Sequence, residues 1–158
     1  MRILMYCDED IGVAAGGSRQ VLELAKALAL RGHEVTVVAP QPEGGTGALA
    51  VSDQLHMQFV SVVRRGALRS LSFLWGSMRM MAKLLQGQPP DVLLWFDSPG
   101  QMAPLWALRN STCPVVYFVN GLPVEEVRGV WRLPPLLGLL SYGLRLASRK
   151  ATALVSVC

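Results

Sequence analysis

The chain has few cysteines, no long uninterrupted apolar run, and two long stretches without any acidic side chain. Its three cysteines, Cys7, Cys113 and Cys158, are far apart and have neither Cys-x-x-Cys nor His spacing, which argues against a disulfide framework and a zinc site. No stretch reaches the roughly 18 to 20 uncharged apolar residues that span a bilayer. The apolar run of residues 3–7 soon meets three acids, so we expect neither a signal peptide nor export.

The composition is that of a soluble globular domain. Of the 158 residues, 51% are hydrophobic and only 16% are charged, which excludes intrinsic disorder and coiled coil and predicts a buried core. A length of this size corresponds to a single domain. We therefore expect one domain over residues 1–158.

The net charge of +4 conceals a block pattern. Residues 54–90 and residues 127–158 each carry five bases and no acid, whereas the two remaining blocks are net acidic. Such basic, Leu-rich and Trp-containing segments attract phosphates or anionic lipid headgroups, although solvated helix faces produce the same pattern. Nucleic acid is disfavoured, because polar and aromatic residues are not interleaved as on base-stacking surfaces.

Short apolar runs alternate with helical patterns along the chain. The predicted strands are 3–6, 35–38, 59–63, 92–96, 115–119 and 153–157, and the predicted helices cover 21–28, 68–85, 102–108 and 136–147. This alternation predicts an α/β fold, a Rossmann-like doubly wound parallel sheet with helices on both faces. We expect the last strand to be buried.

Local signals mark the element boundaries. Ser18 is expected to cap the first helix, and Gly32 to end it in the left-handed conformation. Pro89 and Pro90 terminate the second helix, and residues 40–56, rich in glycine and proline, form a loop.

In an open parallel sheet, ligands bind beyond the carboxyl ends of the strands. This rule selects residues 7–18, 39 onward, 64–66, 97–100 and 120–123. The first of these loops contains Gly12, Gly16 and Gly17 and leads into a helix N-terminus, which favours a phosphate or carboxylate. Glycines of this kind also serve merely to pack a helix against a strand, so the spacing leaves both interpretations open.

Other common sites do not fit. The loop lacks the Gly-x-Gly-x-x-Gly dinucleotide fingerprint and the P-loop lysine, so a nicotinamide- or flavin-dependent enzyme is disfavoured. The acidic residues 8–10 would suit the magnesium site of a receiver domain. That fold needs its phosphoacceptor aspartate at the end of the third strand, where this chain has Arg64 and Arg65. His33 is interpreted as a turn residue and His56 as a loop residue, and no Ser/His/Asp arrangement is indicated.

Several segments of the chain form a pattern that is specific only when they are taken together. They are MRILMY at 1–6, AGGSRQVLELAKAL at 15–28, RGHEVTVV at 31–38, PDVL at 90–93, PVVY at 114–117, NGLP at 120–123 and ATALVS at 151–156. Together these segments resemble the N-terminal half of family 4 glycosyltransferases with the GT-B fold. The resemblance covers nearly the whole chain and implies one half of a GT-B fold.

The resemblance implies retaining transfer of a sugar from a nucleotide-sugar donor to a glycan or lipid-linked acceptor, without a metal or other cofactor. The implied donor-phosphate and acceptor residues are Gly16, Gly17, Ser18, Arg19, Asp97, Ser98 and Gly121. It also implies a cytoplasmic protein, peripheral on the inner face of a membrane, with anionic lipid contacted through residues 64–83 and 128–150.

Two departures from the family pattern matter. Asn120 stands at the position of a family histidine, and asparagine takes up no proton near neutral pH. The family's Glu-x7-Glu element is missing, so we expect the C-terminal nucleotide-sugar-binding domain to be absent, and the chain alone to be inactive as a fragment or as one subunit of a split enzyme. The alternative is a non-catalytic Rossmann-like module that binds a phosphorylated or lipid ligand.

Overall fold

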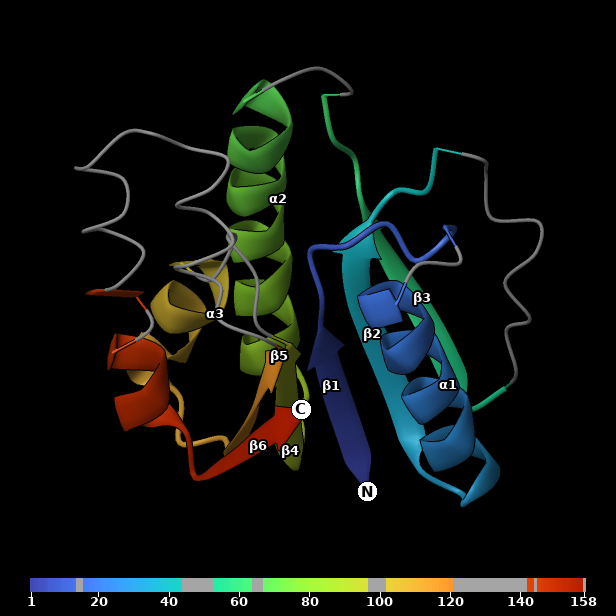
Figure 1. Ribbon diagram of the computed structural model, residues 1–158. Helices are drawn as coiled ribbons and strands as arrows, with labels where there is room; N and C mark the ends of the chain where they lie inside the picture. The colour runs from blue at the N-terminus through green and yellow to red at the C-terminus, as the bar shows by residue number, and fades with distance from the viewer. Residues whose placement is uncertain are drawn as a thin grey trace.

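The computed structural model describes residues 1–13, 16–43, 53–63, 67–96, 102–120, 142–143 and 145–157. Six strands form one sheet in the order β3-β2-β1-β4-β5-β6, and every neighbouring pair is parallel. This is the strand order of the doubly wound Rossmann fold, which reverses direction between β1 and β4. The predicted α/β architecture is confirmed (Figure 1).

The elements follow one another in the alternation that the sequence predicts. The strands are β1 (Arg2–Tyr6), β2 (Glu34–Pro40), β3 (Leu55–Val60), β4 (Val92–Phe96), β5 (Val115–Asn120) and β6 (Ala153–Val157). The helices are α1 (Gly16–Leu30), α2 (Ala67–Gln86) and α3 (Met102–Ala107), followed by a short 3-10 turn at Leu108–Asn110. Residues 145–150 are also helical.

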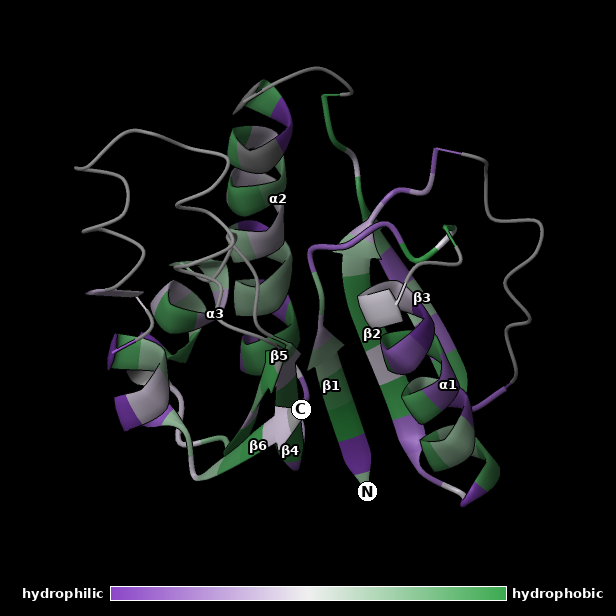
Figure 2. Cartoon of the chain, viewed as in Figure 1, coloured by the Kyte–Doolittle hydropathy of each residue, from purple (hydrophilic) through white to green (hydrophobic). Residues whose placement is uncertain are grey.

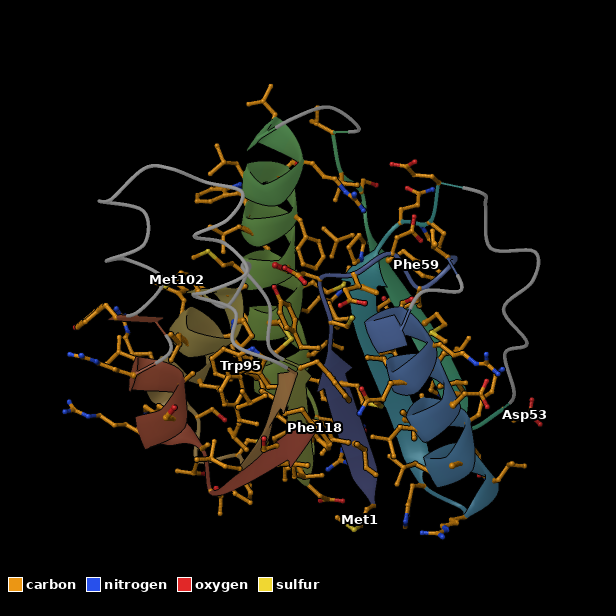
Figure 3. The ribbon with its side chains drawn as sticks, viewed as in Figure 1. Met1, Asp53, Phe59, Trp95, Met102 and Phe118 are labelled. Atoms are coloured by element: carbon orange, nitrogen blue, oxygen red, sulfur yellow. The ribbon has the colours of Figure 1, made fainter. Side chains whose placement is uncertain are left out.

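Two apolar clusters lie on opposite faces of the sheet. On one face, α1 packs through Val21, Ala25 and Ala29. On the other face, α2 and α3 pack around Trp95 and Tyr117, whose ring centroids lie 5.0 Å apart. Figure 3 labels Trp95 and Phe118, which belong to these two different clusters. Figure 2 shows hydrophobic colour along most of β1 and β4, as expected for strands covered on both faces.

The C-terminus of α1 is fixed by the backbone. Gly32 has a φ of +83°, a conformation that an L side chain rarely adopts. Its N–H donates to the carbonyl of Ala29, and the N–H of His33 donates to the carbonyl of Leu28. These two bonds form a Schellman motif, as the prediction for Gly32 requires.

Three local predictions were wrong. The third strand spans Leu55–Val60 and not 59–63, so His56 lies within β3, where it pairs with Thr36. Leu55 is buried and His56 is exposed, and this alternation of an edge strand is a weaker signal than the apolar run at 59–63 that follows it. The last strand is an edge strand and is not buried, because Leu154 is 59% exposed.

The third error concerns the start of α1. The helix begins at Gly16, so Ser18 lies inside its first turn and is not the cap. Its hydroxyl donates instead to the carbonyl of Val13, over 2.7 Å. Ser18 is only 1% exposed, and this bond satisfies a polar group that would otherwise be costly to bury.

Gly76 lets α2 approach β3 closely. A Cβ at position 76 would overlap the Cγ1 atom of Val60. We expect Gly76→Ala to lower the free energy of unfolding by about 1–3 kcal/mol through overpacking, which outweighs a gain of about 1 kcal/mol in helix propensity. Urea unfolding measures the effect. In a Val60→Ala background the same substitution should cost less, and an identical effect in both backgrounds would contradict the predicted contact.

Candidate functional site

A pocket of about 630 Å³ lies at the carboxyl end of the sheet, beside the N-terminus of α1. It is lined by residues from the β1–α1 loop, from the start of α1, from the end of β2 and from α2. These residues are Asp8, Glu9, Asp10, Val13, Gly16, Gly17, Ser18, Pro40, Arg69 and Phe73. The pocket occupies the edge at which open parallel sheets bind their ligands.

Asp10 fixes the β1–α1 loop. One oxygen of its carboxylate accepts the N–H of Gly12 over 2.8 Å, and the other accepts the N–H of Glu43 over 3.1 Å. The same side chain therefore joins the loop after β1 to the loop after β2. Together these two hydrogen bonds hold in place the backbone that leads into α1.

Gly17 lies directly under the carboxylate of Glu9. A Cβ at position 17 would come within 2.5 and 2.6 Å of the two oxygens of that carboxylate. A negative group is favoured here, because the first turn of a helix presents free N–H groups and the positive end of the macrodipole. A Cβ at Gly16, by contrast, would meet nothing within 4 Å.

Arg69 and Phe73 enter the pocket from α2. Phe73 is buried, and its ring stacks on that of Tyr6 with centroids 5.8 Å apart. The hydroxyl of Tyr6 lies 3.4 Å from that of Ser77, one turn further along α2. These contacts fix the inner wall of the pocket, and Arg69 supplies a cationic side chain, the only one among the described residues that line it.

The pocket combines three carboxylates with this guanidinium. Carboxylates accept hydrogen bonds from hydroxyl groups, and a guanidinium donates several in a fixed geometry. Two groups near the pocket, the Cys7 thiol and the Tyr6 phenol, have a pKa well above the ordinary value. The main cause in both is burial, which disfavours the charged form. Both groups are protonated at neutral pH, so Cys7 is not an activated nucleophile.

The structure places the predicted site residues unequally. Gly16, Gly17 and Ser18 all line the pocket, whereas Arg19 is exposed and is not among its lining residues. Asn120 ends β5, and its side chain lies outside the described part of the chain. Other predicted residues also lie outside the described part of the chain. They are Asp97, Ser98, Gly121, the segment 64–66, and residues 128–141 of the predicted basic segment.

Sequence reasoning missed Arg69 and Phe73. Both belong to an amphipathic helix pattern that indicates only packing, and they reach the site because the first turns of α2 stand beyond the ends of the strands (Figure 1). Within the described residues, no three His, Cys, Asp or Glu side chains could together hold a metal ion. Among those same residues, no helix is long and apolar enough to cross a membrane.

Comparison with known sequences decides the family. The profile of Glycosyltransferase Family 4 matches residues 14–158, which is most of the chain. The chain belongs to glycosyltransferase family 4. A search of curated proteins gave no match. The resemblance stated from the sequence is therefore confirmed.

Solved structures agree on the fold. A UDP-N-acetylglucosamine 2-epimerase of Listeria monocytogenes, described as putative, superposes with a TM-score of 0.61 at 11% identity over 98% of this chain and 39% of its own. MurG of Acinetobacter baumannii superposes with a TM-score of 0.56 at 17% identity over 99% of this chain and 41% of its own. Os79 of O. sativa, solved in complex with UDP, superposes with a TM-score of 0.56 at 14% identity over 99% of this chain and 46% of its own.

These similarities concern the fold of this chain. The fold is Rossmann-like and corresponds to one half of a GT-B fold. The chain spans less than half the length of these three proteins.

Proposed function

We propose that this family 4 chain is the acceptor-side half of a retaining glycosyltransferase, which works with a nucleotide-sugar-binding half. The observation that carries the proposal is the pocket of about 630 Å³, which joins a helix N-terminus with three carboxylates at the carboxyl edge of the sheet. A sugar acceptor offers several hydroxyl groups, and carboxylates are the acceptors that such hydroxyls need.

The glycines serve the donor side of the pocket. Gly17 allows a diphosphate to approach the free N–H groups at the start of α1, with Gly16 beside it. The carboxylate of Glu9 covers this position, so an arriving phosphate has to displace it from the helix N-terminus. Ser18 secures the turn through its bond to Val13.

In the transfer itself, the bond from the anomeric carbon to the diphosphate oxygen breaks and a bond to an acceptor oxygen forms. The proton of the acceptor hydroxyl passes to the leaving diphosphate. The part of this chain is to bind and orient the acceptor, which lowers the barrier by fixing the reacting groups in place. Arg19, Asp97, Ser98 and Gly121 remain proposed contacts of donor or acceptor, and Asn120 the residue at the family histidine's position.

We further propose that the protein acts in the cytoplasm, on the inner face of a membrane. The support is the distribution of charge, because residues 54–90 and 127–158 contain ten bases and no acid. Basic segments of this kind are attracted to the anionic lipids of the cytoplasmic leaflet. No metal or other cofactor is needed in this proposal.

The test is sugar transfer by the protein isolated from its source cells, together with any partner that stays bound. UDP-glucose, UDP-N-acetylglucosamine and GDP-mannose serve as donors with a membrane extract as acceptor. We expect one donor to give a glycosylated product with retained anomeric configuration, and the 158-residue chain alone to give none. Binding of a phosphorylated or lipid ligand without transfer from any donor would favour the non-catalytic module.

A further inference from the structure

Another pocket lies at the opposite edge of the sheet from the candidate site. It measures about 250 Å³ and is bounded by the last turns of α2, by the end of α3 and by the segments that lead into β4 and β5. The helix α3 lies beside the C-terminal half of α2 (Figure 1). We call this cavity the amino-edge pocket. Besides two alanines and a leucine, the residues that line it are Gln86, Pro89, Trp106, Arg109, Ser111 and Thr112.

The core beneath the amino-edge pocket fixes its walls. Leu85, from the last turn of α2, and Leu108, from the turn after α3, belong to the same buried apolar cluster. The N–H of Ser111 donates to the carbonyl of Leu108, and the thiol of Cys113 donates to the carbonyl of Pro90 over 3.5 Å. These contacts hold the segment before β5 against the segment before β4. A ligand therefore meets a formed pocket and orders little of the chain on binding, which favours affinity.

Trp106 supplies the aromatic surface of this pocket. Its side chain is 49% exposed although it lines a concave site. Arg109 follows three residues later, in the 3-10 turn, where side chains three residues apart lie above one another. The indole ring therefore keeps apolar area in water, which a ligand with a flat apolar face can cover.

The rest of the lining is polar with little charge. Gln86, Ser111 and Thr112 offer an amide and two hydroxyl groups, and Arg109 is the only charged side chain among the described residues that line the pocket. The side chains of Gln86, Arg109 and Thr112 make no hydrogen bond to any other described residue. The hydroxyl of Ser111 accepts the N–H of Cys113 over 3.2 Å and keeps its own proton for donation. Such groups match a ligand that is rich in hydroxyls.

A pyranose ring fits this combination of groups better than an anion does. The faces of the ring carry C–H groups that can cover an indole, and its rim carries hydroxyls that both donate and accept hydrogen bonds. A single exposed guanidinium holds an anion only weakly, because water and salt screen the attraction. A volume of about 250 Å³ lies just below the roughly 300–1,000 Å³ of pockets for drug-sized ligands, which suits one ring.

We propose that the amino-edge pocket binds one hexopyranose residue of a glycan, stacked on Trp106 and hydrogen-bonded to Gln86, Arg109 and Thr112. This site is separate from the candidate site. Phe73 lines one pocket and Leu85 the other, and the twelve residues of α2 between these positions span about 18 Å. The inference goes beyond the proposed function, because binding here needs neither a donor nor a reaction.

Chemical shifts of N–H groups test this site. The isotope-labelled chain is titrated with methyl β-D-glucopyranoside, a single ring whose hydroxyl groups are all equatorial. Mannitol is the control ligand, because it carries similar hydroxyls on an open chain without a rigid C–H face. We expect the glucoside to shift the indole N–H of Trp106 and the amides of Gln86 and Thr112, with a dissociation constant of roughly 1–10 mM. Mannitol should bind about tenfold more weakly.

Two substitutions in the pocket should weaken binding of the glucoside. Trp106→Ala removes the apolar surface and should raise the dissociation constant about tenfold or more, and Thr112→Val removes one hydrogen bond and should raise it about three- to tenfold. Both residues are exposed, so both variants should fold, which circular dichroism checks. Trp75→Ala is the matched control. Trp75 is 60% exposed on α2 and is not among the residues that line this pocket, so its removal should leave binding unchanged.

Three results would each overturn the inference. They are the absence of shifts at the pocket up to about 50 mM glucoside, equal binding of glucoside and mannitol, and equal losses in Trp75→Ala and Trp106→Ala. Inorganic phosphate or adenosine that shifts these residues when the glucoside does not would assign the pocket to an anion or a nucleobase instead. Binding of the glucoside by a protein that transfers sugar from no donor would refute the proposed function and leave this inference intact.

Discussion

Gly17→Val should reduce sugar transfer by the intact enzyme by about a hundredfold or more, because displacement of reacting groups by even 1 Å has an effect of that size. The valine side chain would occupy the space in front of the first turn of α1, where the diphosphate is proposed to bind. The assay compares turnover of wild type and variant at saturating donor, after circular dichroism has shown that both are folded. A folded variant with unchanged turnover would refute the role of Gly17.

A second variant separates two causes of this loss. A Cβ at position 17 also meets the carboxylate of Glu9, so a valine there displaces that side chain. In Glu9→Ala/Gly17→Val the internal contact is gone, whereas the space for the diphosphate is still filled. We therefore expect the double variant to remain inactive. Recovery of activity would show that the displaced Glu9 caused the loss, which contradicts the phosphate-approach account.

Trp95→Ala should destabilise the chain by about 3–5 kcal/mol, which is a large part of the roughly 5–15 kcal/mol that stabilises a typical domain. Trp95 is fully buried between the sheet and the layer of α2 and α3, where it packs against Tyr117. Its removal leaves a cavity that the surrounding helices fill only in part.

Trp75→Ala is the matched control for this substitution. The same atoms are removed, but Trp75 is 60% exposed and its ring faces the guanidinium of Arg79. We expect a change within about 0.5 kcal/mol, typical of surface sites. Urea unfolding followed by circular dichroism measures both variants. Equal losses would contradict the assignment of Trp95 to the core and of Trp75 to the exposed face of α2.

The fold could be predicted from the sequence because most strands are buried on both faces. β4 and β6 occur at the predicted residues, since each stands out as an apolar run next to turn residues. β3 was placed too late, because an edge strand with alternating exposure, such as Leu55–Val60, has no such run. The exposure of β6 could not be predicted, because strand order across the sheet is a property of the tertiary structure.

The candidate site could be predicted only in its loop. Gly16 and Gly17 were selected because they lie between the carboxyl end of a strand and the start of a helix, whereas Arg69 and Phe73 belong to a helix pattern dominated by packing. Their place in the site depends on how far α2 extends beyond the sheet, and no local signal encodes that. The covering of Gly17 by Glu9 likewise arises from the path of the loop in three dimensions.

The mass of the native species in the source cells shows whether this chain works together with a second domain. The 158 residues have a mass of 17.2 kDa. We expect a polypeptide of roughly twice this size, as two domains of similar length require, or a stable complex of this chain with a second polypeptide that binds a nucleotide-sugar. A native species of 17.2 kDa with no bound partner would contradict the claim that this chain is one half of a glycosyltransferase.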